Sequence, residues 1–182
     1  MRDKIATPGY TEFMHQHFAM FARYNAWANS RLYDAAAELS DSEYRADRGA
    51  FFSSVHGTLN HLLVTDRIWM HRFTGQGPTY RALDAILYDA FEQLRAAREQ
   101  EDERIVAFVD SLDEASLAAH FSYTRASTAE SIVQPLASAL SHLFSHQTHH
   151  RGQVHMLLTG LGREAPPLDL AFFQRETGIG MT

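Results

Sequence analysis

The sequence predicts a single all-α domain over residues 1–182, a four-helix bundle of long antiparallel helices with short extra helical turns. Four long segments carry apolar residues at the three- and four-residue spacing of a helix face. Short stretches rich in Gly, Pro, Ser and Asp separate these segments, as expected for loops between helices. The chain of 182 residues, 45% of them hydrophobic, is long enough to bury one core without disulfides.

The first two long helices are expected at about residues 10–39 and 51–73. The motif SDSE at residues 40–43 has the spacing of a capping box, so a short extra turn is expected there. The second helix should end at GQGP, residues 75–78, because Gly and Pro interrupt helices. The buried stripe of the first helix is expected to contain Phe13, Phe21, Tyr24, Trp27, Leu32 and Tyr33.

The third long helix is expected at about residues 80–112. Its middle, RAAREQEDER at residues 95–104, is rich in charged side chains and is therefore interpreted as a solvated face. FSYTRAST at residues 121–128 is the only stretch with short strand character, and we interpret it as a loop.

The fourth long helix should begin near Gln134, with Pro135 tolerated in its first turn. It should end near Leu161, because Gly162 follows at the position where helices commonly stop. In a bundle of this kind, ligand and metal sites are built between facing helices. Functional side chains are therefore sought on the inward faces of these helices.

Composition excludes several classes of function. A net charge of -6 and the lack of any Lys/Arg run argue against a nucleic-acid or membrane partner. The chain has no Cys, which removes thiolate metal sites and a cysteine nucleophile. No apolar run approaches the roughly 20 residues of a membrane span, and the first residues lack the apolar core of a signal peptide. A cytoplasmic location is expected.

Five of the 11 histidines lie in HLFSHQTHHRGQVH, residues 142–155. A helix advances about 100° per residue, which places His150 on the apolar face and His146 at the edge of that face, one turn earlier. Side chains four residues apart on a helix are neighbours, so these two imidazoles can bind one ion. The helical spacing therefore selects His146 and His150 as metal ligands. The same helical spacing places the other three histidines further from the apolar face: His142, His149 and His155.

A third ligand should come from the second helix, which contains SVHGTLNHLLVTDRIW at residues 54–69. His61 lies in mid-helix with apolar neighbours and is preferred, although the helical wheel does not exclude His56. Three histidines with open positions match a catalytic zinc site better than a structural one. We expect one divalent transition metal, zinc or nickel ahead of iron, manganese or copper. The spacing itself does not choose between them, because neutral imidazoles suit zinc, nickel, iron and copper alike.

The same pattern has a plainer interpretation, in which the histidines form a polar helix edge or hydrogen-bonded core positions without a metal. Asp66 lies near the apolar stripe of the second helix, where an unpaired carboxylate would be costly. We expect it to be tied to the first helix through Asn25, Asn29 or Trp27 rather than to orient a metal ligand. Gly152, inside the fourth helix, suggests close approach of another helix or of the site itself.

Three stretches together resemble the DinB/YfiT-like superfamily of metalloproteins: YNAWANSRLY at 24–33, TLNHLLVTDRIW at 58–69 and HQTHHRGQ at 146–153. The resemblance covers most of the chain in the right order. It implies a four-helix bundle whose metal is held by one histidine of the second helix and two of the fourth. By position these are His61, His146 and His150. Ser145 departs from the Asn that many relatives carry before the first histidine of the fourth helix.

Relatives of this kind include thiol transferases that use bacillithiol and a mycothiol-dependent isomerase. The resemblance therefore implies a metal-dependent enzyme, of the thiol-S-transferase or hydrolase type, acting on a small molecule such as a low-molecular-weight thiol. The alternative is a non-catalytic metal-binding stress-response module. A homodimer is expected, because relatives often pair and the first helix is rich in aromatic residues all round. The sequence assigns no catalytic residue beyond the metal ligands.

Overall fold

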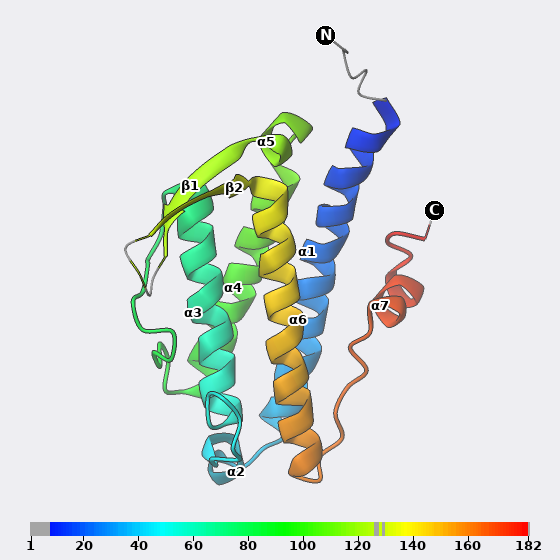
Figure 1. Ribbon diagram of the computed structural model, residues 1–182. Helices are drawn as coiled ribbons and strands as arrows, with labels where there is room; N and C mark the ends of the chain where they lie inside the picture. The colour runs from blue at the N-terminus through cyan, green and yellow to red at the C-terminus, as the bar shows by residue number, and fades with distance from the viewer. Residues whose placement is uncertain (1–7, 126–127, 129, 182) are drawn as a thin grey trace.

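The computed structural model describes residues 8–125, 128 and 130–181. Four long helices form a bundle (Figure 1): α1 (Pro8–Ala37), α3 (Val55–Thr74), α4 (Phe91–Asp110) and α6 (Leu136–Gly160). The shorter elements are α2 (Asp41–Arg45), α5 (Glu114–Ala118), β1 (His120–Thr124), β2 (Ser131–Pro135) and α7 (Leu170–Thr177). The predicted helical bundle is confirmed. None of the described helices is long and apolar enough to cross a membrane.

Figure 1 shows α1 and α6 running in one direction and α3 and α4 in the other. The antiparallel neighbours are therefore α1 with α4 and α3 with α6, and both pairs are in contact. The consecutive helices α3 and α4 run in the same direction, because residues 75–90 carry the chain back along α3 before α4 begins.

This crossover explains why the third long helix begins at Phe91 and not near residue 80, where the sequence pattern placed its start. The backbone N–H groups of Leu87 and Tyr88 donate to the side-chain oxygen of Asn60 on α3, at 2.9 and 3.1 Å. Backbone donors held by another helix are not available for a helix of their own. Tertiary contact therefore overrides the helical pattern of this segment.

The interpretation of residues 121–128 as a loop is wrong for residues 121–124, which belong to β1. The strand pairs antiparallel with β2, with Phe121 opposite Gln134. Tyr123 faces inward and its ring lies 5.2 Å from that of Trp69 on α3. Residues 126, 127 and 129 lie outside the described residues. Because β2 takes residues 131–135, the fourth long helix begins at Leu136, just after Pro135.

Tyr24, Leu32 and Tyr33 of the expected stripe of the first helix are buried, and Phe21 and Trp27 are half-buried. Phe13 is an exception, since it is 60% exposed. The capping box predicted at Ser40 and Glu43 is present at the start of α2. The C-terminal helix α7 had no counterpart in the sequence pattern, and its Phe173 packs against Tyr24 and Trp27 of α1.

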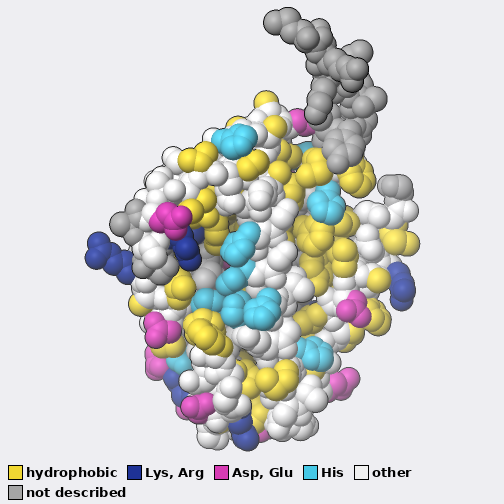
Figure 2. All heavy atoms as spheres, viewed as in Figure 1, with side chains coloured by type: hydrophobic (Ala, Val, Ile, Leu, Met, Phe, Trp, Pro, Cys, Tyr) yellow, Lys and Arg dark blue, Asp and Glu magenta, His cyan; other side chains and the backbone are white. Residues whose placement is uncertain are grey.

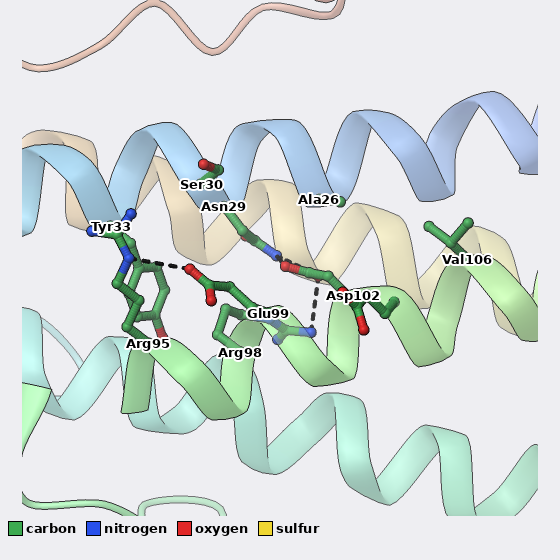
Figure 3. A pocket seen from close by; sticks show the side chains of 10 residues that line it. Ala26, Asn29, Ser30, Tyr33, Arg95, Arg98, Glu99, Asp102 and Val106 are labelled. Atoms are coloured by element: carbon green, nitrogen blue, oxygen red, sulfur yellow. Dashed lines mark hydrogen bonds and ion pairs between the residues drawn. The ribbon is translucent and has the colours of Figure 1, made fainter. Parts of the chain in front are cut away.

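The segment RAAREQEDER is solvated on one side only. Glu99 and Glu103 are exposed, whereas Arg98 and Asp102 are only 1% and 7% exposed. Arg98 forms ion pairs with Asp66 of α3 at 2.7 Å and with Asp102 at 3.0 Å. Figure 3 looks into a pocket of about 300 Å³ between α1 and α4, where Asn29 points toward Asp102. The Asn29 amide donates to that carboxylate at 3.0 Å. The middle of α4 is charged because it carries a buried ionic network.

Asp66 is therefore tied to α4 and α6, and the expected bond to α1 is absent among the described residues. Its carboxylate accepts from Arg98 and from the side-chain amide of Gln147 on α6. Burial raises the pKa of Asp66 to about 6, while the Arg98 charge opposes that rise. The asparagines of α1 serve a second buried cation instead, because Arg151 donates to Asn25 and Asn29.

Replacing Arg98 with Ala should lower the free energy of unfolding by about 3–5 kcal/mol, because Asp66 would keep its burial and lose its charged partner. Chemical denaturation at neutral pH measures this loss. The matched control is Arg95→Ala on the same helix, where the arginine side chain is 30% exposed and pairs with Asp34 and Glu99. That change should cost less than about 1 kcal/mol. Equal losses in the two variants would contradict the assigned role of the buried pair.

Candidate metal centre

The structure brings His61 of α3 together with His146 and His150 of α6. The Nε2 atom of His61 lies 3.4 Å from that of His146 and 3.2 Å from that of His150. One nitrogen of each ring lies within 4.8 Å of the others, and no second cluster of three or more His, Asp or Glu side chains is this close together among the described residues. The antiparallel packing of α3 on α6 is what makes these side chains meet.

The spacing of the three nitrogens fits a single ion. Zinc–nitrogen bonds are about 2.0–2.1 Å long, so two imidazoles in a tetrahedral site hold their nitrogens about 3.3–3.4 Å apart. The two separations from His61 agree with this spacing. These two separations, and the 4.8 Å within which all three nitrogens lie, are compatible with one metal ion between the rings.

Hydrogen bonds from Nδ1, the ring nitrogen that points away from the other histidines, fix the tautomer and orientation of His61 and His150. His61 donates through Nδ1 to the backbone carbonyl of Leu83 at 2.7 Å, and this carbonyl can only accept. His150 donates through Nδ1 to the side-chain oxygen of Gln153 at 2.8 Å. Both neutral rings therefore turn an unprotonated Nε2 toward the same point. Two facing lone pairs repel each other, and a cation between them converts that repulsion into two bonds.

His146 differs from the other two. Its Nδ1 is buried and has no hydrogen-bond partner among the described atoms. Ser145, the position that departs from the pattern of relatives, is exposed. The orienting hydrogen bonds in this chain come from Leu83 and Gln153 instead.

An aromatic ring closes one side of the site. Phe52 stacks on His61 with ring centres 3.7 Å apart and meets His150 edge-on at 5.5 Å. The loop before α3 folds back so closely that a Cβ at position 57 would lie 2.1 Å from the Phe52 carbonyl oxygen. Gly57 is therefore required for this approach. Ser53, between them, is the one described residue other than Gly with a positive φ, 65°.

The other histidines of the two helices lie outside the group. His56, which the helical wheel left open as the third ligand, lies 3.2 Å through Nε2 from the Tyr88 carbonyl. The His142 ring packs on Trp69 at 5.1 Å and lies 5.8 Å from His146, so it borders the site. His149 is exposed and approaches the edge of His150. His155 is half-buried.

Sequence reasoning missed the residues that support the ligands. Leu83 acts through a backbone carbonyl, which no side-chain pattern reveals. Gln153 was detectable in principle, because it lies three residues after His150 on one helix face. Gly152 was expected to mark close approach of another helix or of the site itself. Both expectations are wrong, since nothing lies within 4 Å of a Cβ placed there.

A pocket of about 610 Å³ reaches the site between α3 and α6. The β-hairpin and the segment after α3 contribute to its walls, and His146 and His142 are part of its lining. Figure 2 shows histidine side chains gathered on this face, beside a hollow that Lys or Arg side chains border. A small molecule in this pocket would therefore lie next to the three nitrogens.

Burial keeps the three rings in the form that binds metals. It lowers the pKa of His61 to about 4 and, together with the neighbouring histidines, that of His146 to about 3. Burial also lowers the pKa of His150. All three imidazoles are therefore neutral at pH 7, and a neutral imidazole has a lone pair to donate.

The chain is similar to known proteins in both sequence and fold. The sequence profile of the DinB family matches residues 14–181. The chain is 25% identical over 158 residues to a Bacillus subtilis protein, Protein DinB, covering 82% of this chain and 89% of that one. Its fold is similar to the crystal structure of a DinB-like protein from Bacillus cereus, with a TM-score of 0.62 and 16% identity. That likeness covers 81% of this chain and 94% of the other.

In the metal-free protein, the imidazoles of His61 and His146 should titrate near 4 and near 3, well below the ordinary 6.5. The unfolded chain takes up these protons near 6.5, so the two groups lower stability as the pH falls from 6.5 toward the folded-state values. They have no such effect above 6.5. Proton NMR of the ring Cε1–H signals measures this, with each His→Ala variant supplying the assignment. Midpoints near 6.5 in the folded protein would contradict the geometry.

Proposed function

The chain belongs to the DinB family, and on that premise we propose that it binds one divalent transition metal ion through His61, His146 and His150. The observation that carries the proposal is the fixed direction of the ring nitrogens. Two outer hydrogen bonds turn neutral lone pairs toward each other at 3.2 Å, an arrangement that favours a cation. Zinc and nickel suit an all-imidazole site, whereas manganese prefers oxygen ligands.

We further propose that the protein is a metal-dependent enzyme of the thiol-S-transferase or hydrolase type. The described residues offer three ligand groups and no fourth, and a pocket reaches one of them. An open position beside a pocket is typical of catalytic sites. When bound, the ion would supply Lewis-acid activation of a water molecule or of the sulfur of a small thiol.

The chain's own residues prepare the site for such chemistry. Phe52 covers the ring of His61 and excludes water from that side. The Leu83 carbonyl holds the same ring in one tautomer, so its metal-binding nitrogen needs no reorganisation. On the other side the pocket leaves space for a substrate next to His146.

The formation of a homodimer stays a prediction.

Replacing His61, His146 or His150 with Ala should weaken metal binding by more than about a hundredfold. The loss of an outer hydrogen-bond partner alone costs 10–100-fold, and these changes remove a ligand. Titration calorimetry with zinc or nickel, on protein purified without a His tag, measures the affinity. The matched controls are His142→Ala and His155→Ala, on the same helix as two of the ligands, which should retain one equivalent of metal. Unchanged affinity in any of the first three variants would remove that residue from the site.

The enzymatic part of the proposal is tested by activity screening. With low-molecular-weight thiols and electrophilic acceptors, or with hydrolysable esters and amides, the metal-loaded protein should turn over one class. A chelator should abolish the activity, and zinc or nickel should restore it. The His61→Ala variant should be inactive because it loses a metal ligand, although none of the residues that line the pocket is changed. Tight metal binding without turnover in any of these screens would favour the non-catalytic metal-binding module.

A further inference from the structure

The pocket beside the three histidines is basic, although the chain as a whole has a net charge of -6. Three arginines contribute to its lining, from three different parts of the fold: Arg72 on α3, Arg81 in the crossover and Arg125 after β1. None of the described residues that line it is Asp or Glu. A pocket with cations and no acid has a positive potential that attracts anions.

Arg72 is the best-defined of these cations. Its guanidinium carbon lies 4.5 Å from the ring centres of both Trp69 and Tyr123. Its one described hydrogen bond is to the backbone carbonyl of Thr124, at 3.4 Å. No carboxylate of the described residues forms an ion pair with it, whereas buried Arg98 has two. Burial lowers the pKa of Arg72, as expected for a cation that has lost water and gained no counter-charge.

The other two arginines leave the pocket's charge largely uncompensated. Arg81 is exposed and forms no ion pair among the described residues. Arg125 pairs with Glu130 at 3.4 Å, and both side chains are more than half exposed. Such exposed pairs are weak and exchange easily with a stronger partner. The guanidinium groups of Arg81 and Arg125 can therefore turn toward a ligand, while that of Arg72 is already held at the pocket by Trp69 and Tyr123.

We propose that this pocket binds an oxyanion, a carboxylate or phosphate group, of the small molecule that reacts at the three-histidine site. The planar fork of a guanidinium matches both groups through paired N–H donors, and the aromatic rings hold that of Arg72 in place. An oxyanion bound here is part of the substrate only if the protein is the metal-dependent enzyme proposed above, and in this respect the inference rests on the proposed function. Anion binding itself requires no metal.

The arginine pocket and the three histidines are joined by a chain of side-chain contacts. Trp69, against which Arg72 packs, also contacts His142, which lies one turn from His146. Arg81 lies two residues before Leu83, whose carbonyl orients His61. An oxyanion held by these arginines would therefore leave the remainder of its molecule to extend toward the three ring nitrogens. The pocket volume of about 610 Å³ suits a small organic acid or phosphate ester.

The test is titration of the metal-free protein with succinate and with inorganic phosphate. Calorimetry gives the affinity, and tryptophan fluorescence reports the pocket, because Trp69 is one of two tryptophans and touches Arg72. At least one probe should bind the wild type. Arg72→Gln should weaken that binding about tenfold or more, because it removes a charged donor pair. The preferred probe assigns the ligand to carboxylates or to phosphates.

Arg175→Gln is the matched control, since this exposed arginine packs on Phe172 and lies outside the pocket. It should leave the affinity unchanged. Arg81→Gln alters an exposed side chain without described hydrogen bonds, so it should fold normally and still weaken binding. Absence of binding by both probes, or equal weakening by Arg175→Gln, would overturn the proposal. His150→Ala, expected to lose the metal, should bind the anion as the wild type does, which separates this inference from the metal site.

Discussion

The ion pair between Asp66 and Arg98 at the centre of the bundle limits how its helices can pack. Both side chains are almost completely excluded from solvent, and either charge without its partner would cost several kcal/mol. The same carboxylate accepts from Gln147 on α6, and Arg98 also pairs with Asp102, which accepts from Asn29 on α1. Each of the four long helices thus contributes to one buried network. A helix that slid along its neighbours would leave a charge or an amide unpaired, so the network selects one axial register.

That register places the candidate metal centre. Gln147 lies between His146 and His150 along α6, and Asp66 follows His61 along α3, so the bond from Gln147 to Asp66 holds the helices where the three ring nitrogens converge. The crossover after α3 completes the arrangement, because Asn60 holds its backbone and Leu83 then orients His61. The same segment provides Arg81 to the adjoining basic pocket. The contacts that hold the helices and the crossover in place therefore also position the three histidines and the basic pocket.

Local periodicity was enough to predict the four long helices, apart from the start of the third. It also selected His146 and His150, because a four-residue spacing on one helix is a property of the sequence itself. The choice of His61 over His56 depended on how α3 faces α6, which the helical wheel did not decide and the family resemblance implied. The other differences between the predictions from sequence and the structure come from contacts between segments that are distant in the chain. The charged stretch around Arg98 looked solvated because its compensating partner, Asp66, lies on another helix. The strand β1 was missed because it forms only by pairing with β2. The contact that orients His61 was missed because it is made by the backbone carbonyl of Leu83, which no side-chain pattern reveals.

We propose that the buried register of the bundle presents three imidazole nitrogens to a single metal ion. The most direct measurement is a crystal structure of the protein saturated with zinc, with anomalous scattering to identify the ion. We predict one zinc bound to Nε2 of His61, His146 and His150, each at about 2.0–2.1 Å, with water or a small ligand on the pocket side. A fully occupied zinc ion whose ligands include none of these three nitrogens would contradict it.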